Sequence, residues 1–230
     1  IKRINSNILI SVDHEGGRVQ RFKDEFTKLP SFESIGILHT DNKEFAENLA
    51  YSCGYVAGYE LKSIGVDINF SPVIDLSTDS DVLNERTFSS TPQTVSKLAS
   101  CYISGLIDNG IIPVLKHFPG HGLVASDTHK EISYSELSLT EIDEHMSVFR
   151  DIIENFHVPV MTSHIKFTNI DSYPVTTSSK WLKVISKNNF KNEIFFISDD
   201  LEMSGINKYH TNLSKVEILK QSLDSGCSMV

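Results

Sequence analysis

Six apolar, β-rich segments recur along the chain, and patterns typical of helices lie between them. Strands of a buried parallel sheet are apolar along most of their length because helices cover the sheet. This alternation therefore predicts an α/β fold with a parallel sheet. The predicted strands are residues 8–13, 65–76, 111–118, 158–165, 193–200 and 227–230.

The segments between these strands carry apolar residues at helical spacing. The predicted helices are 43–63, 92–109, 140–155, 178–189 and 214–225. Thr91 and Pro92 are typical of a helix start, and Gly110 and Gly226 are typical of the residue that follows a helix end. In the helix 43–63, the apolar face is predicted to consist of Phe45, Leu49, Cys53, Val56 and Leu61.

Most predicted strands end in a polar side chain that is capable of chemistry. These residues are Asp13, Asp75, Lys116, His117, His164 and Asp199. In a parallel barrel all such ends lie at one rim, where the active sites of these folds are built. A doubly wound sheet would concentrate its site at one switch point instead. We therefore expect a (β/α)8 barrel of the TIM type.

Eight strands close such a barrel, and only about six can be counted here. We therefore expect residues 1–230 to form a single catalytic barrel domain that is truncated at both ends. The first strand–helix unit and the last part of the barrel are expected to be absent. No linker or repeat divides the chain further.

The composition excludes several classes of function. The formal net charge of −9 argues against a nucleic-acid partner, whose binding surface would be basic. No apolar run approaches the roughly 20 residues that a membrane span needs. The three cysteines form no CxxC pair, which fits a reducing compartment. No GxGxxG or GxxxxGK[ST] motif predicts a nucleotide cofactor, and a monomer is expected.

The segment KHFPGHG places two histidines four residues apart, as on one face of a metal-binding helix. Pro119, Gly120 and Gly122 oppose a helix here, however, and the Glu of HExxH is missing. We therefore expect no metal site. Lys116 and His117, at a strand end, suit hydrogen bonding to a polar ligand, and a purely structural loop is the alternative.

Two further segments carry proton-transfer chemistry. Asp127 lies two residues before His129, and a carboxylate in reach of an imidazole raises its basicity, which makes His129 a candidate general acid/base. An incidental pairing is the alternative. Asp199 and Asp200 end a strand, where adjacent side chains point to opposite faces. One is expected to enter the site, and Asp200 suits a cap of the following turn.

The segment DHEGGRVQRF combines Asp13 and Arg21 with two adjacent glycines. Gly16 and Gly17 allow the backbone to turn tightly beside a ligand. A loop held by salt bridges is the alternative interpretation. Further along, Arg86 follows a turn-rich segment and is a second candidate for ligand binding.

Five motifs in this order resemble glycoside hydrolase family 3 and, within it, the bacterial β-N-acetylhexosaminidases of peptidoglycan recycling. They are DHEGGRVQRF, GVDINFSPVIDL, KHFPGHG, SDTHKE and ISDDLEMSG. The resemblance implies that Asp199 is a nucleophile and that His129, paired with Asp127, is the acid/base. It implies that the N-acetylglucosamine ring is held by Asp13, Arg21, Arg86, Lys116 and His117, with Met203 beside the sugar.

The resemblance also implies a substrate and a location. The expected reaction is retaining exo-hydrolysis of terminal β-1,4-linked N-acetylglucosamine from muropeptide-derived GlcNAc–1,6-anhydroMurNAc, in the cytoplasm and without a cofactor. Alternatives are another family 3 β-glycosidase, a glycoside phosphorylase, a non-catalytic sugar-binding relative or a metal-dependent hydrolase. His14 stands where relatives usually carry Gln, a change expected to be tolerable at a loop start.

Overall fold

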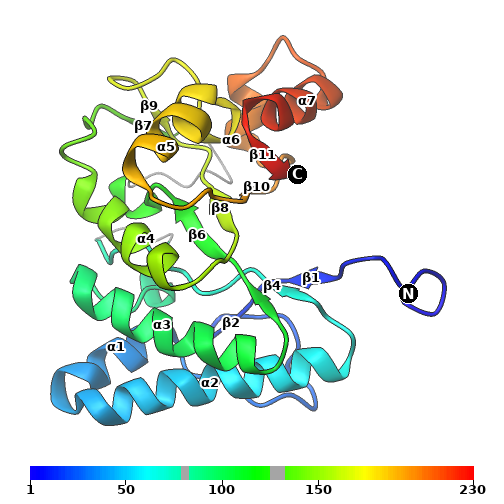
Figure 1. The fold of residues 1–230 in the computed structure, drawn as a ribbon, viewed down its shortest axis with the longest axis vertical. Helices are drawn as coiled ribbons and strands as arrows, with labels where there is room; N and C mark the ends of the chain where they lie inside the picture. Colours follow the sequence, from blue (N-terminus) through cyan, green and yellow to red (C-terminus); the bar gives the residue numbers. More distant parts are fainter. Residues whose placement is uncertain (79–82, 125–132) are drawn as a thin grey trace.

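The computed structural model describes residues 1–78, 83–124 and 133–230 as an array of parallel strands with helices outside it (Figure 1). Strand β1 (Ser11–Val12) pairs with β4 (Ile68–Asn69), and β4 pairs with β5 (Ile112–Pro113). A second sheet has the order β6, β8, β10, β11. Its strands are Leu115–Phe118, Val160–Thr162, Phe196–Ser198 and Cys227–Met229. All of these pairings are parallel.

The two sheets form one continuous, curved arrangement. A parallel bridge joins Val73, just after β4, to Lys116 in β6. Neighbouring strands therefore follow one another in chain order, as successive strands do in a TIM-type barrel. The predicted parallel α/β architecture is confirmed, and each predicted strand contains an observed strand.

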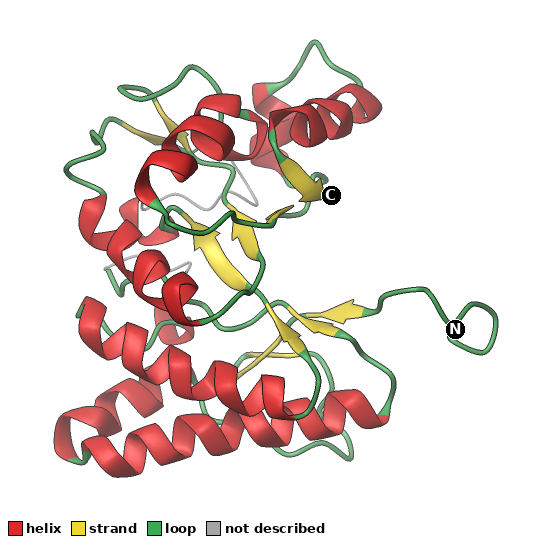
Figure 2. Cartoon of the chain, viewed as in Figure 1, coloured by secondary structure: helices red, strands yellow, loops and turns green. Residues whose placement is uncertain are grey.

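Helices cover the outer side of the strands (Figure 2). They are α2 (Lys43–Ser63), α3 (Pro92–Asp108), α4 (Asp143–Asn155), a π-helical turn Lys180–Ile185 continuing into α5 (Ser186–Asn189), and α7 (Lys215–Ser225). The five predicted helices are thus present, although α4 begins at Asp143 rather than near Thr140. None of the helices in the described ranges combines the length and apolar character of a membrane span.

Several short elements were not predicted. They are α1 (Phe32–Asp41), α6 (Ser204–Tyr209), the hairpin β2 (His14–Gly16) and β3 (Val19–Gln20), the strand pair β7 (Tyr134–Ser135) and β9 (Lys166–Phe167), and the 3-10 turns Asn84–Arg86, His121–Leu123 and Val175–Thr177. Helix α1 begins where the Ser31 side chain accepts a hydrogen bond from the Ser34 amide at 3.2 Å. Such capping satisfies an amide that a helix start would leave without a partner.

The strands separate two apolar regions. The larger core fills the space between strands and helices and includes the rings of Phe118, Phe149 and Trp181. A smaller cluster of Ile68, Val114, Met161 and Ile197 is separate from this core. Met161 and Ile197 also line the pocket described below, so this second cluster forms the floor of the candidate site.

Helix α2 buries most of the apolar face that its sequence predicts, since Leu49 and Val56 also pack against the core, but not all of it. Cys53 and Leu61 are buried, but Phe45 is 56% exposed. The buried face consists mainly of small residues, including Ala46, Ala50, Gly54, Ala57 and Gly58. A Cβ on Gly54 would lie 2.1 Å from the Tyr102 carbonyl oxygen. The backbones of α2 and α3 therefore approach too closely for large side chains between them.

Replacing Gly54 with alanine is expected to lower the free energy of unfolding by about 1–3 kcal/mol, since the new methyl group overlaps α3 backbone. Denaturant titration at neutral pH would measure this. Ser52→Ala, on the exposed side of the same helix, is the matched control and should change stability by less than about 0.5 kcal/mol. An unchanged midpoint for Gly54→Ala would contradict the close approach of these helices.

Candidate active site at the carboxyl ends of the strands

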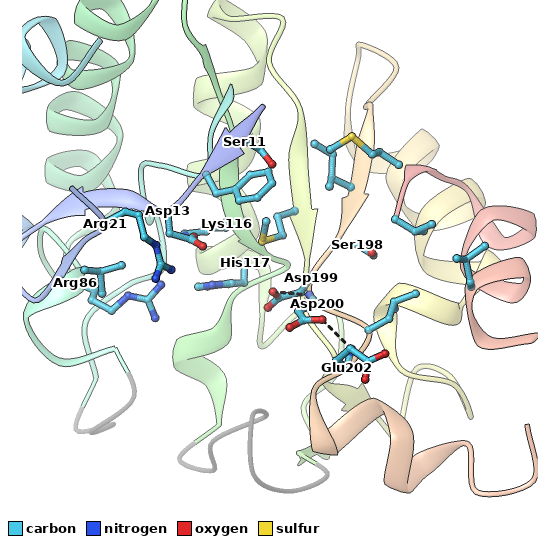
Figure 3. Close-up of a pocket in the computed structure, with 18 residues that line it drawn as sticks. Ser11, Asp13, Arg21, Arg86, Lys116, His117, Ser198, Asp199, Asp200 and Glu202 are labelled. Carbon is cyan, nitrogen blue, oxygen red and sulfur yellow. Dashed lines mark hydrogen bonds and ion pairs between the residues drawn. The ribbon is translucent and has the colours of Figure 1, made fainter. Parts of the chain in front are cut away.

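A pocket of about 780 Å³ opens at the carboxyl ends of β1, β6 and β10 (Figure 3). Its polar side is lined by Asp13, Arg21, Arg86, Lys116, His117, Asp199, Asp200 and Glu202. Its apolar side includes Phe70, Met161, Ile197 and Met229. Six residues that the sequence predicted as functional thus line one pocket although they are distant in the chain.

The strand positions explain why these side chains meet. Asp13 follows β1 directly, and Asp199 follows β10 directly. In β6, Leu115 and Phe118 belong to the large core, whereas Lys116 and His117 line the pocket. Because the strands are parallel, their carboxyl ends lie at one rim, as the sequence predicted.

Lys116 is buried and lies between two carboxylates. Its side chain is 2% exposed, and its Nζ lies 2.7 Å from Asp13 Oδ1 and 2.7 Å from Glu15 Oε1. Arg86 Nε and an Arg86 terminal nitrogen donate to the two Glu15 oxygens at 2.9 and 2.8 Å. We call Asp13, Glu15, Arg86 and Lys116 the charged wall of the pocket.

Charges within this wall keep one another ionised. Burial alone would raise the pKa of Glu15, but the charges of Lys116 and Arg86 outweigh it and lower that pKa to about 2. Burial would lower the pKa of Lys116, yet the carboxylates of Glu15 and Asp13 raise it. The formal charges of the four side chains cancel.

Glu15 was not among the residues that the sequence predicted for the site. One signal was available: Asp13 and Glu15 are two positions apart at the end of a strand, which places their side chains on the same face. Its partner Arg86 lies 71 residues away in the chain. The DHEGG segment is therefore held by salt bridges, the alternative interpretation of its sequence, while Asp13 at its start lines the pocket.

His117 is oriented by a carboxylate behind it. Asp75 is buried, and its Oδ2 accepts a hydrogen bond from the His117 amide at 3.2 Å and lies 2.8 Å from His117 Nδ1. Its Oδ1 accepts from the His121 amide at 2.6 Å. Burial opposes ionisation of Asp75, but the imidazole of His117 and these hydrogen bonds hold its pKa below the usual value.

His121 is also buried and lies against His117 with its ring edge-on, the centroids 5.6 Å apart. Burial, reinforced by the neighbouring His117, lowers the pKa of His121 to about 4. His121 is therefore neutral at physiological pH and does not line the pocket. This position agrees with a role in shaping the loop.

Asp199 lies at the end of β10 with its carboxylate half-buried. Its Oδ1 accepts from the Asp200 amide at 2.8 Å. Burial would raise the pKa of Asp199, but the imidazoles of His117 and His164, together with that hydrogen bond, lower it. The group is therefore ionised at neutral pH, as a nucleophile or general base must be.

The turn after Asp199 is fixed by two neighbours. Asp200 Oδ1 accepts from the Glu202 amide at 2.8 Å, so Asp200 caps this turn as predicted. His164, at the end of β8, lies with Nε2 3.0 Å from the Asp200 carbonyl oxygen and Nδ1 2.8 Å from Thr176 Oγ1. Because a carbonyl only accepts, Nε2 carries the proton in that contact.

Some predicted residues are not at the pocket. Met203 was expected beside the ligand, but it packs with Ile206 and Ile218 in a separate apolar cluster and does not line the pocket. The reason is local: the Met203 amide bonds to the Asp200 carbonyl, which closes the turn and directs the chain into α6. Asp127 and His129 lie in 125–132, outside the described residues.

His14 does not lie at a loop start, as its place after Asp13 had suggested. It belongs to β2, is fully buried, and its ring lies 6.1 Å from that of Phe22 and 5.7 Å from that of Phe26. Its backbone exchanges two hydrogen bonds with the Asn69 side chain. The imidazole thus fills the core beneath the hairpin and does not line the pocket.

No group of three or more His, Cys, Asp or Glu side chains in the described ranges is arranged to hold a metal ion. The three cysteines are all free thiols, with Cys53 and Cys227 buried and Cys101 half-buried. Burial raises the pKa of Cys53 to about 11 and that of Cys227 to about 12. These two thiols are therefore unreactive core residues.

Known protein sequences match nearly the whole of this chain. The family described as glycosyl hydrolase family 3 N terminal domain matches residues 2–230. A protein named Beta-hexosaminidase from Nitrosomonas eutropha is 40% identical over 225 residues, which are 97% of this chain and 64% of that protein. The chain thus spans less than two thirds of that curated relative.

Solved structures agree with this match. Native NagZ from Neisseria gonorrhoeae superposes with a TM-score of 0.87 at 35% identity, covering 98% of this chain and 65% of that one. The same protein in complex with N-trifluoroacetyl-D-glucosamine gives the same TM-score and identity. The described strands are therefore part of a TIM-barrel-like α/β fold.

Proposed function

Because the chain belongs to glycosyl hydrolase family 3, through its N-terminal domain, we propose that it carries the catalytic barrel of a β-N-acetylhexosaminidase. The observation that carries this proposal is the position of Asp199: an ionised carboxylate lies in the same pocket as the charged wall and His117. The substrate we propose is terminal β-1,4-linked N-acetylglucosamine of GlcNAc–1,6-anhydroMurNAc, cleaved in the cytoplasm during peptidoglycan recycling.

The proposed mechanism is a double displacement with retention. Asp199 attacks the anomeric carbon and forms a covalent glycosyl-enzyme, while His129 donates its proton to the departing glycosidic oxygen. His129 then removes a proton from water, which attacks the anomeric carbon and releases Asp199. Asp127 holds the imidazole of His129 in the required tautomer. The low pKa of Asp199 supports its role as the nucleophile.

Sugar recognition is proposed for the polar side of the pocket. Asp13 supplies hydroxyl acceptors, and Arg21, Arg86, Lys116 and His117 supply donors, so ring hydroxyls find partners of both kinds. The apolar side can contact the carbon face of the ring or an N-acetyl methyl group. The relative that was solved with N-trifluoroacetyl-D-glucosamine supports this ligand class.

The experiment that tests the function is hydrolysis of aryl β-N-acetylglucosaminides and aryl β-glucosides, with the sugar product followed by proton NMR. We expect preferential cleavage of the N-acetylglucosaminide with the β-anomer as first product. Preference for the glucoside would indicate another β-glycosidase, and formation of sugar 1-phosphate in phosphate buffer would indicate a phosphorylase. Loss of activity with a chelator would indicate a metal-dependent hydrolase. Binding without hydrolysis would indicate a sugar-binding protein.

Replacing His129 with glycine is expected to slow turnover while sparing ligand binding, because the substitution removes the proposed proton donor. The loss in kcat should be about 10²–10⁴-fold on the natural disaccharide. It should be smaller on aryl substrates whose leaving group needs no proton. Near-wild-type rates on the disaccharide would remove His129 from the mechanism.

A further inference from the structure

Glu15 is a buried carboxylate that contacts two pocket-lining cations but does not itself line the pocket. Its side chain is 2% exposed, whereas that of Asp13 is 39% exposed. Both carboxylates contact the same nitrogen of Lys116. Within the charged wall, Glu15 is therefore the buried carboxylate and Asp13 is the carboxylate that faces the pocket.

The backbone around Glu15 is fixed independently of its carboxylate. The Tyr102 hydroxyl donates to the carbonyl oxygens of His14 and Glu15 at 3.3 and 3.5 Å. Gly16 follows at φ 121°, where a Cβ would lie 2.5 Å from the Pro30 carbonyl oxygen. The hairpin is therefore held by its backbone, and the Glu15 carboxylate remains available for the two cations.

A buried ammonium group needs a counter-charge, because burial without one is costly. Without Glu15, the nearest anion to Lys116 would be Asp13, and Arg86 would lose the two-pronged partner that sets the plane of its guanidinium. Asp13, which already contacts Lys116 at 2.7 Å, would then be the one carboxylate of the charged wall left to balance both Lys116 and Arg86. The wall would also gain one positive charge.

We propose that Glu15 is a positioning and specificity-determining residue: it orients Arg86 and Lys116, shares the charge of Lys116 with Asp13, and keeps the charged wall suited to an uncharged ligand. This inference rests on the proposed function, because the ligand it concerns is the N-acetylglucosamine ring. Glu15 touches no substrate in this scheme and acts through its two partners. The raised pKa of Lys116, to which the Glu15 charge contributes most, agrees with this arrangement.

The test compares Glu15→Gln with wild type, using an aryl β-N-acetylglucosaminide for kinetics, and N-acetylglucosamine and its 6-phosphate as inhibitors. We expect KM to rise by about 10- to 100-fold with a smaller change in kcat. The inhibition ratio should shift toward the phosphorylated sugar by about tenfold. An unchanged KM and an unchanged inhibition ratio would overturn the proposal.

Glu85→Gln is the matched control. Glu85 is the chain neighbour of Arg86, and its carboxylate accepts from the Arg18 amide at 3.0 Å. This variant removes the same charge nearby and should leave KM and the inhibition ratio as in wild type. An equal shift in both variants would assign the effect to net charge and overturn a specific role for Glu15.

A double-mutant cycle separates positioning from general damage to the fold. In an Arg86→Gln background, Glu15→Gln should raise KM by a clearly smaller factor than in wild type, because one of its two targets is already absent. Equal factors in both backgrounds would overturn the proposal. If Glu15→Gln does not fold, Glu15→Asp keeps the charge but shortens the reach, and KM should still rise more than kcat falls.

The proposal can also be tested without measuring enzyme activity. In wild type, the Arg86 Nε–H is held by Glu15, so its NMR signal should exchange slowly with water, whereas in Glu15→Gln it should exchange rapidly. If wild type neither binds nor cleaves N-acetylglucosaminides, the proposed function fails, but this measurement still decides whether Glu15 orients Arg86. Slow exchange in both proteins would overturn that role.

Discussion

Asp199→Ala is expected to lower kcat on an aryl β-N-acetylglucosaminide by at least about 10³-fold, since removing the proposed nucleophile removes the covalent route. The carboxylate is half-buried at the end of β10, and its lowered pKa keeps it ionised at neutral pH. Steady-state kinetics would measure the loss. Ligand affinity should change much less, because the charged wall remains intact.

Two controls sharpen this result. Asp200→Asn changes the adjacent carboxylate, which caps the next turn, and should cost less than about tenfold. Added azide should partly rescue Asp199→Ala and give a glycosyl azide of inverted configuration, because the small anion replaces the lost nucleophile on the same face. A β-configured azide would instead mark Asp199 as the acid/base, and full activity without azide would remove it from the mechanism.

Asp75→Asn is expected to destabilise the protein by about 1–3 kcal/mol, because a buried hydrogen-bond donor loses its acceptor. Both oxygens of the Asp75 carboxylate accept hydrogen bonds. Oδ1 accepts from the His121 amide, and Oδ2 accepts from the His117 amide and also lies 2.8 Å from His117 Nδ1. An asparagine must direct an NH₂ group at one of these donors. Denaturant unfolding at neutral pH would measure the change, and ligand binding should weaken because His117 is released.

The pH dependence of stability gives a second measurement of the contact between Asp75 and His117. The folded-state pKa of Asp75 lies below its usual value, so its stabilising contribution is present above the ordinary carboxyl range and is lost as the pH falls through the folded value. Asp75→Asn should therefore lose less stability on acidification than wild type. Asp108→Asn, which alters an exposed contact with Tyr51, is the control and should cost less than about 1 kcal/mol. Equal acid sensitivity in Asp75→Asn and wild type would contradict this assignment.

The fold was predictable from sequence because its signal is local. Continuous apolar strands and amphipathic helices follow from residue type and spacing, and the parallel arrangement then brings Asp13, Lys116 and Asp199 to one rim. The tight contact of α2 and α3 was not predictable in this way. It depends on where Gly54 meets the α3 backbone, which spacing within one helix does not specify.

The sequence predicted pocket-lining residues that lie at the ends of strands, but it did not predict Glu15, which is buried beside them. Glu15 is defined by partners from other strand–helix units, so its importance emerges only in the folded chain. Met203, which the resemblance implies lies beside the sugar, does not line the described pocket. It follows Asp199 closely in sequence, but the capped turn after Asp200 carries it into a separate cluster.

The charged wall joins three chain segments: the one after β1, the turn containing Arg86, and β6. Its side chains thus tie these segments together, and three of them also line the pocket. A sugar bound there, as proposed, would contact all three segments at once, and a substitution that separates the segments would also displace the groups that contact the sugar. Substitutions in the charged wall are therefore expected to lower the stability of this rim and its affinity for ligand together.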